Sequence, residues 1–261
     1  MERLYVIKIG GNIIDDDALL SVFLKKFARI KSKKILVHGG GKLATRLAEK
    51  LGIPQQMAEG RRITDAETLK IVTMVYAGHI NKNIVAELQS LQCNAMGISG
   101  ADGNSILAHK RTKSGIDYGF AGDIDKVNAD WFKQLFENGL SLVVASITHD
   151  GKNQLLNTNA DTIAQEIAKA MSSSYAVSLV YGFEKSGVLM DVENDNSVIP
   201  VLQAGYYQEL KESKKIFAGM IPKLDNAFAA ISQGVNEVII GKGEELDLLI
   251  TGKTGTTIRH D

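Results

Sequence analysis

The alternation of short apolar runs with helical patterns is the feature that most limits how this chain can fold. Residues 4–9 form an apolar run closed by a glycine pair, which predicts a buried strand. Further strands are expected at 34–37, 94–98, 141–147, 175–180 and 237–240, and helices at 17–30, 43–51, 64–91, 130–138, 159–171 and 220–233. Strands that alternate with helices indicate a mainly parallel open sheet covered on both faces. We therefore predict an α/β fold, a three-layer αβα sandwich.

Several local patterns refine this prediction. Residues 104–127 alternate in character and contain turn glycines, which predicts a hairpin, and the charge-rich residues 191–195 indicate a solvated hairpin tip. Thr64 and Glu67 form a pattern typical of a capping box at the start of a helix. The 261 residues fit one large domain or two modest ones, and the serines at 172–174 are the best candidate for a boundary between lobes 1–172 and 173–261.

Composition excludes several classes of protein. The 30 Lys and Arg residues balance 30 Asp and Glu residues, which argues against a protein that tracks a nucleic-acid backbone. The single cysteine, Cys93, excludes a disulfide framework and a cysteine-cluster metal site. No apolar run reaches the roughly 18 residues of a membrane span, and no leader is visible, so we expect a cytoplasmic protein. The chain has 25 glycines but only 3 prolines, which suggests sites of close backbone approach.

Two sequence features lie at or near the carboxyl ends of predicted strands, where an open α/β sheet binds its ligands. The glycines at 39–41 follow a predicted strand and allow bare backbone to meet an anion, although a simple turn is the favoured explanation when this triplet is taken alone. Lys8 lies inside an apolar strand, where an ammonium group is costly to bury without an anionic partner. That partner could be a carboxylate of the protein or a bound phosphate. The common P-loop, the Gly-x-Gly-x-x-Gly fingerprint and a nucleophile elbow near histidine are all absent.

Five short motifs are nevertheless distinctive as an ordered set. They are Lys-Ile-Gly-Gly at 8–11, His-Gly-Gly-Gly-Lys at 38–42, Gly-Arg-Arg-Ile-Thr at 60–64, Asn-Thr-Asn-Ala-Asp at 157–161 and Gly-Met-Ile-Pro-Lys at 219–223. Residues 119–123 and 255–258 add to the set. Together these motifs resemble the amino-acid kinase family, and within it the acylglutamate kinase branch. The resemblance spans nearly the whole chain.

The resemblance implies an enzyme, a phosphotransferase with a carboxyl group as acceptor. It implies that ATP phosphorylates the γ-carboxylate of N-acetyl-L-glutamate or N-succinyl-L-glutamate, the second step of arginine biosynthesis. Mg²⁺ is expected with ATP and held chiefly by its phosphates, because no carboxylate cage is visible and no metal-binding residue is assigned. It also implies that the 1–172 lobe carries the acceptor site and a dimer interface, and that the 173–261 lobe binds ATP.

The resemblance also implies roles for individual residues. Lys8 and Lys223 would neutralise charge on either side of the transferred phosphoryl group, and Asp161 would orient both ammonium groups. The residues implied to bind the acceptor are Gly40, Gly41, Arg62, Asn157 and Asn159. Those implied to bind the phosphates and ATP are Gly10, Gly11, Gly182, Phe183, Lys185, Gly187, Gly219 and Met220. Outside this set of motifs, Arg62 would be read as a surface residue and Asn157 as a helix cap.

The chain departs from the family pattern in three places. Residues 181–187 differ from the usual nucleotide-side turn, so the adenine contacts are not assigned. Arg61 stands where the family usually has an apolar residue, and we hypothesise that it favours a longer, acidic acyl group such as succinyl, although a solvent-facing side chain is an equal alternative. The chain starts three residues before its first strand, from which we expect a homodimer without feedback inhibition by arginine.

Other interpretations of the sequence stay open. Carbamate, aspartate, glutamate 5- and uridylate kinases belong to the same superfamily. A non-catalytic nucleotide-binding regulator on the same fold is an alternative of another class, but it would not need both Lys8 and Lys223. An α/β domain with ordinary glycine turns leaves Lys8 unexplained.

Overall fold

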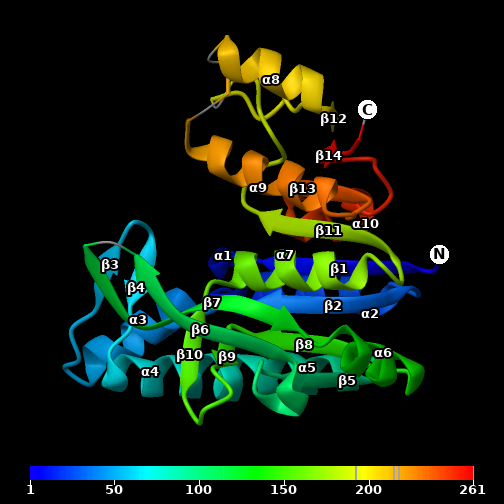
Figure 1. Cartoon of the computed structure of the whole chain (residues 1–261). Helices are drawn as coiled ribbons and strands as arrows, with labels where there is room; N and C mark the ends of the chain where they lie inside the picture. Colours follow the sequence, from blue (N-terminus) through cyan, green and yellow to red (C-terminus); the bar gives the residue numbers. More distant parts are fainter. Residues whose placement is uncertain (114, 192, 214, 217, 261) are drawn as a thin grey trace.

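An eight-stranded sheet forms the centre of the molecule in the computed structural model, which describes residues 1–113, 115–191, 193–213, 215–216 and 218–260. Its strands are β1 (Arg3–Ile9), β2 (Lys33–His38), β5 (Ala95–Ile98), β8 (Ser141–Ala145), β11 (Ala176–Phe183), β12 (Val201–Leu202), β13 (Glu237–Lys242) and β14 (Thr256–Ile258). The order is β12-β14-β13-β11-β1-β2-β8-β5 (Figure 1). Every neighbouring pair is parallel except β13 and β14. The predicted mainly parallel sheet is confirmed.

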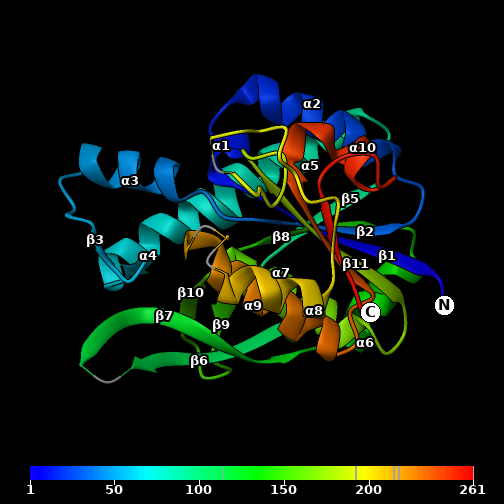
Figure 2. The ribbon, with the colours of Figure 1, turned by 90° about the horizontal axis from the view of Figure 1, so that it is seen from above.

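Helices cover both faces of this sheet (Figures 1 and 2). They are α1 (Gly11–Ile14), α2 (Asp17–Arg29), α3 (Gly41–Lys50), α4 (Ala66–Thr73), the π-helix η1 (Met74–Ile80), α5 (Asn81–Ser90), α6 (Ala129–Glu137), α7 (Ala160–Met171), α8 (Ala204–Glu212), α9 (Ile221–Ser232) and α10 (Leu246–Leu249). Short 3₁₀ turns are η2 (Asp102–Asn104), η3 (Ala218–Met220) and η4 (Gly243–Glu245).

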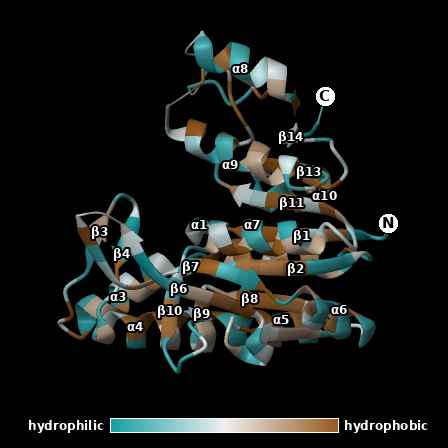
Figure 3. Cartoon of the chain, in the orientation of Figure 1, coloured by the Kyte–Doolittle hydropathy of each residue, from teal (hydrophilic) through white to brown (hydrophobic). Residues whose placement is uncertain are grey.

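The alternation of side chains along β1 divides the core into two layers. Leu4 and Val6 join a hydrophobic core with α6, α7 and α9, whereas Ile7 and Ile9 join a second core with α2, α4, α5 and α10. Such strict alternation is expected because successive side chains of a strand point to opposite faces. In Figure 3 the brown of hydrophobic residues follows the central strands. The three-layer αβα sandwich is therefore confirmed.

A closed barrel of four short strands packs beside the main sheet. It contains β6 (Ile106–Lys113), β7 (Ile116–Val127), β9 (Ile147–His149) and β10 (Leu155–Thr158). The hairpin expected at 104–127 is the β6–β7 pair. A separate small hairpin, β3 (Gln56–Ala58) and β4 (Arg61–Ile63), was not expected from the sequence. In Figure 1 it lies at the same end of the molecule as the tip of the β6–β7 hairpin.

Two local predictions need correction. The helix that was expected to begin with a capping box at Thr64 is capped instead by Asp65, whose carboxylate accepts from the Thr68 amide at 2.7 Å. Thr64 is unavailable because its backbone bonds to Tyr118 and Phe120 of β7. The single strand expected at 141–147 is divided into β8 and β9, which belong to different sheets.

Other elements match their predicted ranges closely. The described residues between 191 and 195 are exposed, as expected, and residue 192 lies outside the described residues. The helix α8 and the strands β10, β12 and β14 were not predicted. None of the helices in the described part of the chain combines the length and the apolar character needed to cross a membrane. The lobe boundary near residue 172 stays a prediction, since the main sheet runs through both halves.

Candidate functional site

The glycine clusters lie at the carboxyl ends of β1 and β2, as the sequence predicts. Gly10 precedes α1, and its amide donates to the carbonyl of Gly182 at the end of β11, at 3.2 Å. Gly40 adopts φ 151° just before α3, and a Cβ at this position would collide with Ile80 of the π-helix. Only glycine fits such a combination of backbone angle and close approach. The loop therefore brings backbone amides to the end of the sheet.

A buried histidine at the end of β2 contacts this glycine loop from the interior of the protein. His38 is fully buried at the end of β2, and burial lowers its pKa to about 4, so the imidazole is neutral near pH 7. Its Nδ1 donates to the carbonyl of Gly39 at 2.9 Å, because a carbonyl can only accept. Its Nε2 then accepts from the Asn81 amide at 3.1 Å. His38 thus ties the glycine loop to α5.

The two predicted catalytic lysines lie near one carboxylate, which contacts Lys8 directly and acts on Lys223 electrostatically. Lys8 lies on the α7-facing side of β1, and its Nζ is 2.7 Å from Oδ1 of Asp161, which stands in the first turn of α7. Lys223 comes from the first turn of α9, and burial together with the neighbouring Lys8 cation lowers its pKa, while Asp161 opposes the shift. The ring of Phe183 lies beneath both ammonium groups. The structure therefore brings Lys8, Asp161 and Lys223 together from three separate elements.

The residues implied to bind the acceptor line one cavity of about 250 Å³. Its walls include Lys8, Gly11, Gly40, Gly41, Arg61, Arg62, Tyr76, Asn157 and Asn159. Arg62 is fixed within this wall, because its Nη2 donates to the carbonyl of Gly41 at 3.0 Å and to Thr45 Oγ1 at 2.9 Å. Its Nη1 donates to Gln55. Several contacts thus hold the guanidinium group in place without a ligand.

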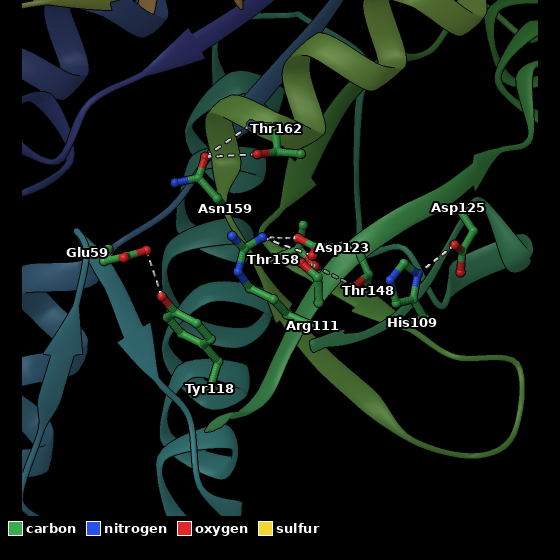
Figure 4. A network of polar contacts seen from close by, with 11 residues as sticks. Glu59, His109, Arg111, Tyr118, Asp123, Asp125, Thr148, Thr158, Asn159 and Thr162 are labelled. Atoms are coloured by element: carbon green, nitrogen blue, oxygen red, sulfur yellow. Dashed lines mark hydrogen bonds and ion pairs between the residues drawn. The ribbon is translucent and has the colours of Figure 1, made fainter. Parts of the chain in front are cut away.

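The two asparagines are held by different means. Asn157 on β10 donates through its side-chain amide to Thr64 Oγ1 at 3.0 Å, which joins the barrel to the segment that carries Arg62. Asn159 caps α7, and its side-chain oxygen accepts from the amide of Thr162 at 3.1 Å (Figure 4). An asparagine at this position stabilises the first turn of the helix. Asn159 therefore has a structural role as well as a place in the cavity wall.

A second network supports the β3–β4 turn from the barrel (Figure 4). The hydroxyl of Tyr118 donates to Oε2 of Glu59 at 3.1 Å. Beside Tyr118, Arg111 stacks over its ring and makes two hydrogen bonds to the Asp123 carboxylate, at 2.7 and 2.9 Å. Glu59 precedes Gly60 in the turn that leads to Arg62. Tyr118, Glu59 and Tyr76 were not predicted from the sequence, because nothing local marks these contacts.

Six of the eight residues implied to bind the phosphates and ATP line a second cavity of about 360 Å³. Its walls include Gly10, Gly11, Lys42, Phe183, Lys185, Gly187, Met220 and Lys223. Gly182 lies at the end of β11, where a Cβ would come within 3.1 Å of the Gly243 backbone, and neither Gly182 nor Gly219 is part of the wall. Gly11 belongs to the walls of both cavities. A group that passes from one cavity to the other at Gly11 would have Lys8 on one side and Lys223 on the other.

Arg61 is part of the walls of two cavities. It lines the acceptor cavity and a third cavity of about 180 Å³, which is also bounded by Asn159, Asp161, Phe183 and Lys223. The alternative of a side chain that points only to solvent is therefore disfavoured. Within the described residues no cluster of three or more His, Cys, Asp or Glu side chains could hold a metal ion.

Comparisons with known proteins bear on the family and the fold of the chain. The amino acid kinase family model matches residues 3–242. The chain is 57% identical to the acetylglutamate kinase of Cytophaga hutchinsonii, with 96% of this chain and 95% of that protein covered. It is 36% identical to the acetylglutamate kinase of Methanopyrus kandleri, with 97% and 99% covered. The crystal structure of Neisseria gonorrhoeae N-acetylglutamate synthase with coenzyme A and N-acetyl-glutamate shares the fold, at a TM-score of 0.83 and 20% identity over 100% of this chain and 60% of that one.

Proposed function

Because this chain belongs to the amino acid kinase family, we propose that it phosphorylates the γ-carboxylate of an N-acyl-L-glutamate with ATP, the second step of arginine biosynthesis. The acceptor is N-acetyl-L-glutamate or its N-succinyl analogue. The relatives named acetylglutamate kinase, which match nearly the full length of the chain, support this choice over carbamate, aspartate, glutamate 5- and uridylate kinases.

One observation carries the proposal. Lys8 lines the acceptor cavity and Lys223 lines the neighbouring nucleotide cavity, while Asp161 pairs with Lys8 at 2.7 Å and acts electrostatically on Lys223. A protein that only binds a nucleotide gains nothing from positive charge on both flanks of a transferred group, because that charge acts on the transition state. A kinase does gain from it.

In the proposed reaction, an oxygen of the γ-carboxylate attacks the γ-phosphorus of ATP. The new carboxylate–phosphorus bond forms as the bond to the ADP oxygen breaks, so the products are an acyl phosphate and ADP. The nucleophile is already an anion, and no base has to remove a proton. Repulsion between carboxylate and phosphate dominates the barrier, and the ammonium groups of Lys8 and Lys223 offset it. Asp161 keeps both groups oriented.

The remaining residues hold the two substrates. We assign Arg62 to the α-carboxylate, because its guanidinium cation is held in a fixed position in the wall of the acceptor cavity. Asn157 and Asn159 hold the acylamino side, and the amides of Gly40 and Gly41 face the acceptor. The assignments for the phosphates and ATP are Gly10, Gly11, Gly182, Phe183, Lys185, Gly187, Gly219 and Met220. Mg²⁺ fits as an ion carried in by the nucleotide, where it neutralises phosphate charge, since the described residues offer it no carboxylate cage.

Arg61 supports a finer proposal about the acyl group. Its side chain reaches the acceptor cavity and the adjoining third cavity, where a cation would attract the free carboxylate of a succinyl group. We expect a higher kcat/KM for N-succinyl-L-glutamate than for N-acetyl-L-glutamate, and we expect Arg61→Gln to reverse the preference. Equal values for the two acceptors, or a preference for acetyl, would contradict this proposal.

A test of the main proposal measures ADP release with purified protein, ATP and Mg²⁺. N-acetyl- and N-succinyl-L-glutamate should support release, whereas carbamate, aspartate, glutamate and UMP should not. Lys8→Ala serves as the background control. Release that depends on UMP or carbamate, and not on any N-acylglutamate, would assign the chain to another branch of the family.

We also propose that the enzyme is a cytoplasmic homodimer. In such a dimer, Met74 on the π-helix, which is 55% exposed in the single chain, would be covered by the partner if this face forms the interface. Light scattering coupled to gel filtration should give twice the 28.3 kDa mass of the chain.

A further inference from the structure

Phe183 has a position that the proposed reaction does not yet use. It is the last residue of β11 and follows Tyr181 on the same face of the strand. Tyr181 is the register partner of Lys8 on β1, and the rings of Tyr181 and Phe183 are stacked with centroids 5.8 Å apart and planes 8° apart. The aromatic pair thus continues directly from the strand position that carries the buried lysine.

Both lysine ammonium groups lie over the Phe183 ring. The Nζ of Lys223 is 4.1 Å from the ring centroid, and the Nζ of Lys8 is 5.4 Å from it. An aromatic face carries partial negative charge and attracts cations within about 6 Å, by about 0.5–1 kcal/mol at exposed sites and about 2 kcal/mol where water is excluded. The half-buried position of Phe183 lies between these limits.

The ammonium groups of Lys8 and Lys223 need a partner that offsets the repulsion between them. Lys8 and Lys223 repel each other, and the Lys8 cation is one cause of the lowered pKa of Lys223. Asp161 is 2.7 Å from Lys8 and compensates part of this repulsion. The Phe183 ring attracts both ammonium groups without adding a second carboxylate, which would repel the incoming phosphates. The ring therefore stabilises the pair of cations and leaves their net positive charge available.

From these contacts we propose that Phe183 is a positioning residue for phosphoryl transfer, whose ring fixes the ammonium groups of Lys8 and Lys223 where the transferred group passes. The inference rests on the proposed kinase function. It deepens the assignment of Phe183 to the nucleotide side, because it gives the ring a role toward the two lysines. Tyr181 stacks beside the ring and Lys223 covers it, so side chains of the protein itself engage the ring.

Phe183 is also more than a filler of the hydrophobic core. It packs against the core on the α7 side, but it also lines the nucleotide cavity and the third cavity. Leucine or methionine would supply similar apolar contact at this boundary without attracting a cation. The structure thus separates a packing role, which leucine preserves, from a positioning role, which requires an aromatic face.

The experiment compares kcat and KM of the full-length wild type with Phe183→Leu and Phe183→Tyr. Loss of two cation contacts should lower kcat about 10-fold in Phe183→Leu, at about 0.5–1 kcal/mol for each contact. The KM values for N-acetyl-L-glutamate and ATP should change less than kcat. Phe183→Tyr keeps the aromatic face and should restore most of the activity. The matched control is Phe136→Leu, which removes a ring on α6 that packs on Tyr175. Neither lysine lies on this helix or near it in the sequence, so the substitution should leave kcat unchanged.

A fluorination series separates the electrostatic effect from shape. Replacing Phe183 by mono-, di- and trifluorophenylalanine withdraws charge from the ring face with little change in volume. We expect log kcat to fall in step with fluorination, and we expect the ε-methylene protons of Lys223 to resonate upfield in the wild type but not in Phe183→Leu.

The two proposals fail in different ways. A wild-type kcat retained by Phe183→Leu, or activity insensitive to fluorination, would overturn the role of Phe183 while leaving the kinase function intact. A wild type inactive on every N-acylglutamate would overturn the kinase function itself, whatever the Phe183 variants do.

Discussion

The acceptor side and the nucleotide side of the site are organised differently. On the acceptor side, Arg62 is held by Gly41, Thr45 and Gln55. On the nucleotide side, the walls are glycine backbone and long side chains, such as the exposed Lys185, which pairs with the equally exposed Asp195 at 3.6 Å. Surface ion pairs of this kind contribute little to order.

This difference suggests a division of labour. A wall whose side chains are already fixed loses little conformational entropy on binding and discriminates among acceptors by geometry. The nucleotide wall combines Gly10, Gly11 and Gly187 with long side chains, and it suits phosphates, whose recognition depends on charge and not on a particular shape. Lys8 lines the acceptor cavity and Lys223 the nucleotide cavity, and in the proposed reaction both act on the transferred group. The comparison predicts a graded set of effects, largest at these two lysines and smallest at the outer supports of the acceptor wall.

The largest effect is expected at the two lysines. Lys8→Ala and Lys223→Ala should each lower kcat about 100- to 1000-fold, because loss of one fixed contact to the transition state costs about 2.7–4 kcal/mol. The measurement is steady-state ADP release at saturating ATP and acceptor. If both variants kept near wild-type turnover, the two lysines would not act on the transferred group.

On the acceptor side, Arg62→Lys should raise the KM for the acceptor about 10- to 100-fold. Lysine keeps the charge but loses the planar fork, and a hydrogen bond to a charged group contributes about 1.5–3 kcal/mol. The KM for ATP should stay nearly constant. The neighbouring substitution Arg61→Lys is the control and should have a smaller effect. Equal rises in both KM values would break the distinction between the two sides.

The contribution of His38 to the free energy of unfolding should depend on pH. The pKa of His38 is about 4 in the folded protein and near 6.5 when unfolded, so the unfolded chain binds more protons between these values. The free energy of unfolding contributed by this site is complete above pH 6.5 and falls as the pH drops toward 4. From pH 7 to pH 5 the loss should be about 2 kcal/mol.

Urea unfolding at several pH values measures this loss. His38→Asn removes the titrating group, so its free energy of unfolding should fall less steeply than that of the wild type over the same range. Identical slopes for the two proteins would show that His38 does not titrate as its burial requires.

The smallest effect is expected at the outer support of the acceptor wall. Tyr118→Phe removes the hydrogen bond to Glu59 and should raise the acceptor KM about fivefold, since a single hydrogen bond contributes about 1 kcal/mol. The kcat value should hardly change. Tyr206→Phe, which removes an exposed hydroxyl elsewhere, is the matched control. A change in kcat without a change in KM would contradict this supporting role of Tyr118.

The sequence predicts the main sheet and the glycine loops better than the long-range contacts that hold the site residues in place. The parallel sheet, Lys8 and the glycine loops are predictable because apolar periodicity and a buried lysine are local signals. The β6–β7 hairpin is predictable for the same reason. The family resemblance then supplies Arg62, Asn157 and Lys223, which no local pattern would identify alone.

The contacts that hold the acceptor wall in place were not predicted, because each joins residues that are distant in the chain. Glu59 and Tyr118 are 59 residues apart, and Asn157 is 93 residues from Thr64. The misplaced helix cap has the same origin, since pairing with β7 occupies Thr64 and leaves the cap to Asp65. Tyr76 reaches the acceptor cavity because a π-helix interrupts the long helix there, and a propensity pattern does not reveal such an interruption.

The most direct test of the account is chemical capture of its product. An acyl phosphate formed from N-acetyl- or N-succinyl-L-glutamate, ATP and Mg²⁺ reacts with hydroxylamine to give a hydroxamate that can be measured. The account predicts hydroxamate with the wild type, equal in amount to the ADP released, and almost none with Lys8→Ala or Lys223→Ala. ADP release without any hydroxamate from an N-acylglutamate would contradict transfer to a carboxylate between the two lysines.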